Sequence, residues 1–147
     1  MGKWLRVWTV GILIGKAGMH LTGRAIFRAA LGLLGEGSAA VADYEEEAVL
    51  AMLGATLCEV QDVDNGLRLA KGLEKGGALS IENLEQETGA QGELERGALP
   101  FALAARLALT DEETTLAAYY NALYVEQVNA LARGRVCPVR DVYGCAE

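Results

Sequence analysis

The residue types that most often carry chemistry are scarce here: a single histidine, His20, and three cysteines. They are scattered along the chain, and the eight-residue separation of Cys137 and Cys145 is not the Cys-x-x-Cys spacing of a standard zinc site. Nothing in the sequence singles out a nucleophile for His20 to activate. Cys137 and Cys145 enclose a short loop, which a disulfide would close in an oxidising compartment and which free thiols would leave open in a cytoplasm. Cys58 is expected to pack as a small buried hydrophobe. We therefore expect no catalytic residue, no metal ligand and no cofactor.

Two segments resemble known ligand-binding motifs but do not match their spacing. Gly11 and Gly15 precede Lys16 as in a phosphate-binding loop, but three residues separate the glycines instead of four, and an alanine follows the lysine. Residues 62–66 start like a calcium loop, but the glycine comes one position early and Leu73 stands where the twelfth-position glutamate belongs. Close packing of small residues explains the segment with Gly11 and Gly15, and a solvated turn explains residues 62–66.

A tyrosine cluster is the best candidate for an interface. Tyr119, Tyr120 and Tyr124 fall on adjacent faces of a predicted helix, where they would line a subunit contact or pack in the core. The acidic run Glu45–Glu47 needs no metal, because the positive end of a helix dipole favours carboxylates in its first turns.

Charge divides the chain into two parts. The first 35 residues contain five Lys or Arg and no acid, whereas the other 112 contain eight Lys or Arg and all 20 Asp and Glu. This asymmetry predicts that the first segment docks on an acidic partner, a neighbouring copy or an anionic membrane surface. The predicted docking residues are Lys3, Trp4, Arg6, Trp8, Lys16, Arg24 and Arg28.

Several classes of protein fit this pattern poorly. The longest uncharged runs of the basic segment, residues 7–15 and 29–35, are too short for a simple membrane span of about 20 residues. No cleavable signal peptide is evident, because Lys16 breaks the apolar stretch. The acidic body disfavours nucleic acid. The sequence leaves the compartment undetermined, with a membrane surface or a virion among the settings that fit.

Apolar spacing predicts mostly helices. Residues 41–60 form one, capped by Ser38 and ended by Asn65-Gly66, and residues 72–98 form a flexible stretch with short helical turns. Pro100 suits the first turn of the next helix.

The last predicted helix runs from a capping box at Thr110 to Arg133. Near the N-terminus, residues 4–18 suit either a helix with a polar stripe or a buried strand.

We therefore expect an all-α, single-domain helical bundle with a basic, apolar N-terminal arm. The arm spans residues 1–35 and the acidic helical domain residues 36–147; a small α/β unit with residues 5–14 as a strand is the alternative fold. The expected function is that of a non-catalytic structural or assembly subunit that forms homo-oligomers or larger assemblies such as rings, filaments, virions or membrane-associated complexes. A small enzyme or ligand-binding helical domain with an unidentified cofactor is the alternative.

Overall fold

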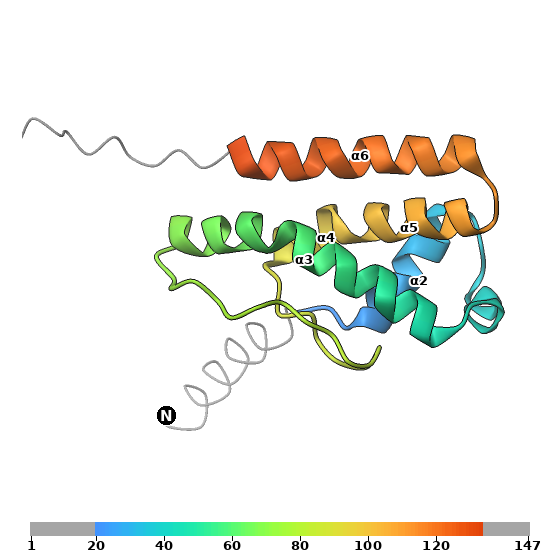
Figure 1. Ribbon diagram of the computed structural model, residues 1–147, viewed down its shortest axis with the longest axis horizontal. Helices are drawn as coiled ribbons and strands as arrows, with labels where there is room; N and C mark the ends of the chain where they lie inside the picture. The colour runs from blue at the N-terminus through green and yellow to red at the C-terminus, as the bar shows by residue number, and fades with distance from the viewer. Residues whose placement is uncertain (1–19, 134–147) are drawn as a thin grey trace, which may run out of the picture.

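The computed structural model describes residues 20–133, and the fold is all-α: helices take up 70% of these residues, with no strand among them. One isolated antiparallel bridge joins Thr22 to Glu87. Figure 1 shows the arrangement. In chain order the elements are α2 (Gly23–Leu33), the 3-10 helix η1 (Ser38–Asp43), α3 (Glu46–Ala70), α4 (Gly92–Gly97), α5 (Leu99–Thr110) and α6 (Thr114–Arg133).

Helix α5 is the centre of the core. It contacts α2, α3, α4 and α6, and α6 runs back along it after a short turn (Figure 1). Leu99, Leu103 and Leu107 are fully buried, and the alanines between them let neighbouring helices approach closely. Pro100 lies in the first turn, as the sequence predicts. A helix surrounded in this way needs apolar side chains on most of its circumference, which its Leu- and Ala-rich sequence supplies.

Helix α2 belongs to the packed body even though it lies in the predicted basic arm. Ile26, Phe27, Ala30 and Leu31 form one buried stripe of the helix. Thr22 caps its N-terminus by accepting a hydrogen bond from the Ala25 amide. The latter part of residues 1–35 therefore contributes to the same core as α3 and α5.

Several predictions fall outside the described residues and stay predictions. They are the helix or strand at residues 4–18, the positions of Lys3, Trp4, Arg6, Trp8 and Lys16, and the state of Cys137 and Cys145.

Helix α3 differs from the predicted helix at both ends. Ser38 starts η1 instead of capping α3, which begins at Glu46. The predicted stop at Asn65-Gly66 is wrong, because α3 continues to Ala70. Gly66 is buried there, and the Asn65 side chain accepts a hydrogen bond from the Gly76 amide, so tertiary contacts outweigh the weak helix propensity of this pair.

Two further predictions from local sequence are wrong. Cys58 is exposed, because the buried stripe of α3 passes through the adjacent Leu57 and Val60. Thr110 does not cap α6: it is the last residue of α5, and its hydroxyl donates to the Arg106 carbonyl at 3.0 Å. The turn between the two helices places Glu112 at a φ of 62°, in the left-handed region.

The predicted flexible stretch, residues 72–98, contains α4 preceded by a long irregular segment. Leu79 and Leu84 are buried in the core. The Gln61 side chain accepts from the Leu79 amide at 2.6 Å, and the Arg24 amide donates to the Leu84 carbonyl at 2.7 Å. These contacts attach the segment to α3 and to the start of α2.

Candidate functional site

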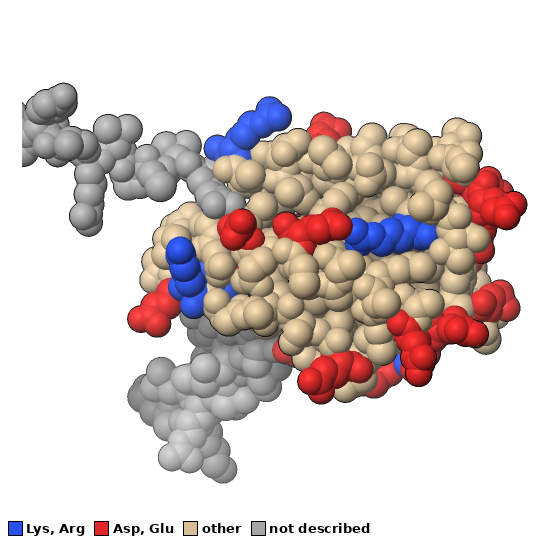
Figure 2. Space-filling model, viewed as in Figure 1, with Lys and Arg blue, Asp and Glu red and all other residues tan. Residues whose placement is uncertain are grey.

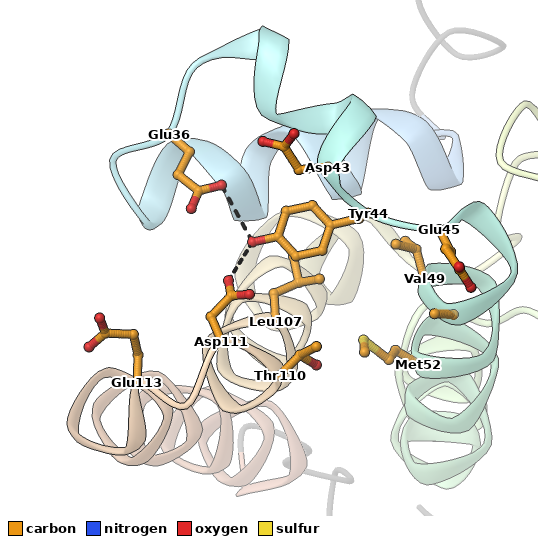
Figure 3. Close-up of a pocket in the computed structure, with 11 residues that line it drawn as sticks. Glu36, Asp43, Tyr44, Glu45, Val49, Met52, Leu107, Thr110, Asp111 and Glu113 are labelled. Atoms are coloured by element: carbon orange, nitrogen blue, oxygen red, sulfur yellow. Dashed lines mark hydrogen bonds between the residues drawn. The ribbon is translucent and has the colours of Figure 1, made fainter.

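The candidate site is an acidic pocket of about 560 Å³, which lies where η1, the start of α3, the end of α5 and the turn before α6 meet (Figure 3). Apolar side chains of Val49, Met52 and Leu107 contribute to its lining. Its carboxylates come from three separate segments of the chain, at Glu36, at 43–45 and at 111–113. We call the following set the acidic pocket carboxylates: Glu36, Asp43, Glu45, Asp111 and Glu113.

Tyr44 stands between two of these carboxylates. Its hydroxyl donates to Asp111 Oδ2 at 2.6 Å and lies 3.5 Å from Glu36 Oε2, so the single phenolic proton serves Asp111 (Figure 3). Its ring packs edge-on against Phe27, with ring centroids 5.9 Å apart. Burial and then the Asp111 hydrogen bond raise the pKa of Tyr44 well above its ordinary value. Tyr44 is therefore a neutral donor at physiological pH.

Helix dipoles affect the pocket carboxylates in opposite ways. Glu45 is the N-cap of α3 and Glu113 directly precedes α6, so both meet the positive end of a helix. Asp111 is the C-cap of α5, where the helix end is itself partly negative. Its charge is unfavourable in that place, which a bound cation would relieve.

The pocket lining carries no positive charge among the described residues, because its members include no Lys and no Arg. Figure 2 shows acidic side chains gathered at the end of the molecule where α3 begins and α5 meets α6. Residues 20–133 as a whole contain 18 Asp or Glu and eight Lys or Arg. The pocket is therefore suited to attract a cationic group.

A chelated metal ion fits this pocket poorly. Within residues 20–133 no three His, Cys, Asp or Glu side chains lie close enough together to hold a metal ion. Carboxylates spread around an apolar lining suit instead the long side chains of Lys and Arg, whose aliphatic stems pack on apolar atoms while the charged ends reach the acids.

Of the predicted docking residues, the structure describes Arg24 and Arg28. Arg24 binds its own chain: its guanidinium contacts Glu46 at 2.7 Å and Glu85 at 2.5 Å, and hydrogen bonds to these two carboxylates raise its pKa. It thereby joins α2 to the start of α3 and to the irregular segment. Arg28 is exposed and shares a small hollow with Glu36.

The predicted tyrosine interface separates into one exposed and two buried residues. Tyr119 is exposed. The Tyr120 hydroxyl donates to the Leu33 carbonyl, and the Tyr124 hydroxyl donates to Glu59 Oε2 at 2.9 Å. The hydroxyls of Tyr120 and Tyr124 therefore attach α6 to α2 and to α3.

Two fully buried carboxylates, which sequence analysis did not single out, hold the segment around α4. Asp64 accepts from the Gln91 amide at 2.7 Å and from Arg68 Nε at 2.9 Å. Glu95 accepts from the Leu21 amide at 2.9 Å and from the Thr88 hydroxyl at 2.6 Å. Each carboxylate satisfies backbone or side-chain donors that would otherwise be buried without a partner.

A broader cavity of about 960 Å³ lies beside Glu95. His20, Lys71 and Arg96 line it together with Glu93. Lys71 Nζ contacts the Glu93 carboxylate at 2.7 Å, so charges of both signs share the lining. His20 Nδ1 is buried 3.5 Å from Glu95 Oε1 and makes no hydrogen bond. This mixed lining favours neither cations nor anions.

No helix in the described part of the chain has the length and apolarity that crossing a membrane requires. Comparison with protein-family models, with curated proteins and with solved structures finds no match to this chain.

Proposed function

We propose that this chain is a single-domain helical bundle that serves as a non-catalytic structural or assembly subunit. In this proposal the cationic side chains Lys3, Arg6 and Lys16 of one copy bind the acidic pocket carboxylates of the next copy. The observation that carries the proposal is the acidic pocket itself, which has five carboxylates and no cation in its described lining. The first 19 residues supply the opposite charge, with three Lys or Arg and no acid.

Electrostatics favours a contact between copies that uses both parts. Two acidic bodies repel each other, whereas a cationic segment on an acidic pocket attracts and sets the orientation. Because the two surfaces differ, the contact is heterologous, and repeating it builds rings or filaments. Exposed charges are screened beyond roughly 8 Å at physiological ionic strength, so this assembly should weaken as salt rises.

The chemistry of the pocket supports a binding role over catalysis. A general acid or base works best when its pKa lies near the working pH. A tyrosine ordinarily ionises at about pH 10, and the raised pKa of Tyr44 moves its proton still further from that range. Its hydroxyl therefore keeps its proton and holds the Asp111 carboxylate in place through their hydrogen bond.

Light scattering on the full chain and on three matched variants tests the proposal. The first neutralises the basic segment (Lys3→Gln, Arg6→Gln, Lys16→Gln) and the second the pocket (Asp43→Asn, Glu45→Gln, Glu113→Gln). The control neutralises three exposed acids elsewhere (Glu74→Gln, Glu82→Gln, Glu126→Gln).

We expect the unmodified chain and the control to form oligomers that dissociate as salt rises. The basic-segment and pocket variants should lose this salt-sensitive association. A monomeric full chain at low and high salt contradicts the proposal, and so does equal association by the pocket variant and the control. Flotation of the full chain with anionic vesicles, lost only in the basic-segment variant, would assign that segment to a membrane surface instead.

A further inference from the structure

The turn between α5 and α6 is strained and lacks the residues that usually end a helix. Glu112 has a φ of 62° and is the only non-glycine residue among residues 20–133 in the left-handed region. A Cβ is unfavourable in that conformation, which is why glycine usually takes this position after a helix. No glycine or proline occurs between Pro100 and Arg133. The local sequence therefore permits one helix that continues through the turn.

Straightening the turn keeps its backbone amides bonded. The amides of Asp111, Glu112 and Glu113 donate to carbonyls of α5 at 3.1, 3.2 and 2.9 Å. In a continuous helix each of these amides donates to the carbonyl four residues earlier, which also belongs to α5. Glu112 then returns to the right-handed region, so its strain is released. The resulting helix, Leu99–Arg133, would be about 52 Å long at roughly 1.5 Å per residue.

Helix α6 is held by contacts that a second copy can reproduce. It packs against α3, α4 and α5, and it runs back along α5 after the turn (Figure 1). The Tyr120 hydroxyl donates to the Leu33 carbonyl, and the Tyr124 hydroxyl donates to Glu59 Oε2 at 2.9 Å. No described element follows α6, so none has to move with it. Once α6 has left the body of its own chain, the α6 of another copy can make the same contacts there.

We propose that two copies of this chain exchange α6. In each copy the turn straightens, α5 and α6 become one helix, and α6 packs on the α5 of the other copy. The partner is a second copy because its α6 matches, residue for residue, the surface that α6 covers in the structure. Since the contacts of α6 are the same in both forms, the balance between them depends on the strained turn and on protein concentration. The inference goes beyond the proposed docking of the basic segment and does not depend on it.

Light scattering coupled to gel filtration measures the exchange in about 1 M NaCl, where a screening length of roughly 3 Å suppresses docking of the basic segment. The full chain is refolded from urea over a range of protein concentrations. Glu112→Gly removes the strain from the closed turn and disfavours the continuous helix. Glu112→Gln is the matched control, because it removes the same charge but keeps a side chain in the left-handed position.

We expect a dimer whose share grows with protein concentration for the full chain and for Glu112→Gln. Glu112→Gly should raise the dimer dissociation constant by at least about 10-fold, since both turns of the dimer change. A full chain that stays monomeric at every concentration overturns the inference, and so does a dimer that Glu112→Gly leaves unchanged.

The exchange also predicts which rings meet across the dimer. Phe101 of α5 and Tyr120 of α6 stack at a centroid distance of 6.2 Å, and in the exchanged dimer these two rings belong to different copies. Isotope-filtered NMR on a dimer refolded from mixed labelled and unlabelled chains should show an NOE between Tyr120 of one copy and Phe101 of the other. A dimer without this NOE overturns the inference.

The two proposals fail separately. Salt-sensitive oligomers with no dimer in high salt would support docking of the basic segment and refute the exchange of α6. A high-salt dimer with the NOE between copies, and low-salt association that the pocket and basic-segment variants leave unchanged, would do the reverse.

Discussion

Replacing Glu95 gives the sharpest test of how the segment around α4 is held. Its carboxylate is fully buried and accepts from the Leu21 amide and the Thr88 hydroxyl. Glu95→Ala removes both acceptors, and each buried donor left without a partner costs roughly 1–3 kcal/mol. We therefore expect a loss of about 3–5 kcal/mol, which is a large part of the roughly 5–15 kcal/mol of a typical domain.

Glu95→Gln should cost far less, because the site can rearrange around an amide. The amide oxygen can still accept from Leu21, and the amide nitrogen can donate to the Thr88 oxygen once that hydroxyl rotates. What is lost is the stronger bonding of an ionised acceptor, about 1–2 kcal/mol.

Urea unfolding followed by the helical circular dichroism signal measures both variants. Equal losses for Glu95→Ala and Glu95→Gln would refute this reasoning, since the charge rather than the acceptors would then matter. A loss below about 1 kcal/mol for Glu95→Ala would show that water reaches the donors.

Three further expectations concern stability. Gly23→Ala should lower the free energy of unfolding by about 1 kcal/mol, since a Cβ there would crowd the buried Leu53 Cδ2 at 3.2 Å and displace the end of the Ile81 side chain; an unchanged melting temperature contradicts this. Asp64→Asn should cost about 2 kcal/mol by weakening the bond from Arg68; urea unfolding of Asp64→Asn, of Arg68→Met and of the double variant should show coupling, and additive losses would argue against the bond. Burial raises the pKa of Tyr124, so the unfolded chain ionises first and stability should fall above about pH 10; a urea midpoint equal at about pH 9 and pH 11 would contradict this.

The sequence was sufficient for the parts of the fold that local patterns determine. The all-α class follows from apolar periodicity, and Pro100 marks the start of α5. Local signals failed where tertiary contacts compete with them. Asn65-Gly66 resembles a helix stop, yet the buried Asp64 and its bond to Arg68 in the next turn continue α3 to Ala70.

The candidate site could not be assembled from the sequence. Its carboxylates come from three segments, and only the fold brings Glu36 and Asp111 to the same tyrosine. The acidic run around Glu45 was visible, but its place at a helix start explained it without a pocket. The one local signal was that Tyr44 lies between two acidic residues. That signal indicates a pocket only when the fold places Asp111, at the end of α5, beside the same tyrosine.

A mixing experiment at low ionic strength tests the central claim most directly. One sample carries Lys3→Gln, Arg6→Gln and Lys16→Gln, which keeps its acidic pocket intact; the other carries Asp43→Asn, Glu45→Gln and Glu113→Gln, which keeps its basic segment intact. The account predicts that the mixture has a higher molar mass by light scattering than either sample alone, because the basic segment of one copy can bind the pocket of the other. A mixture whose mass is the simple average of the two samples would contradict docking between copies.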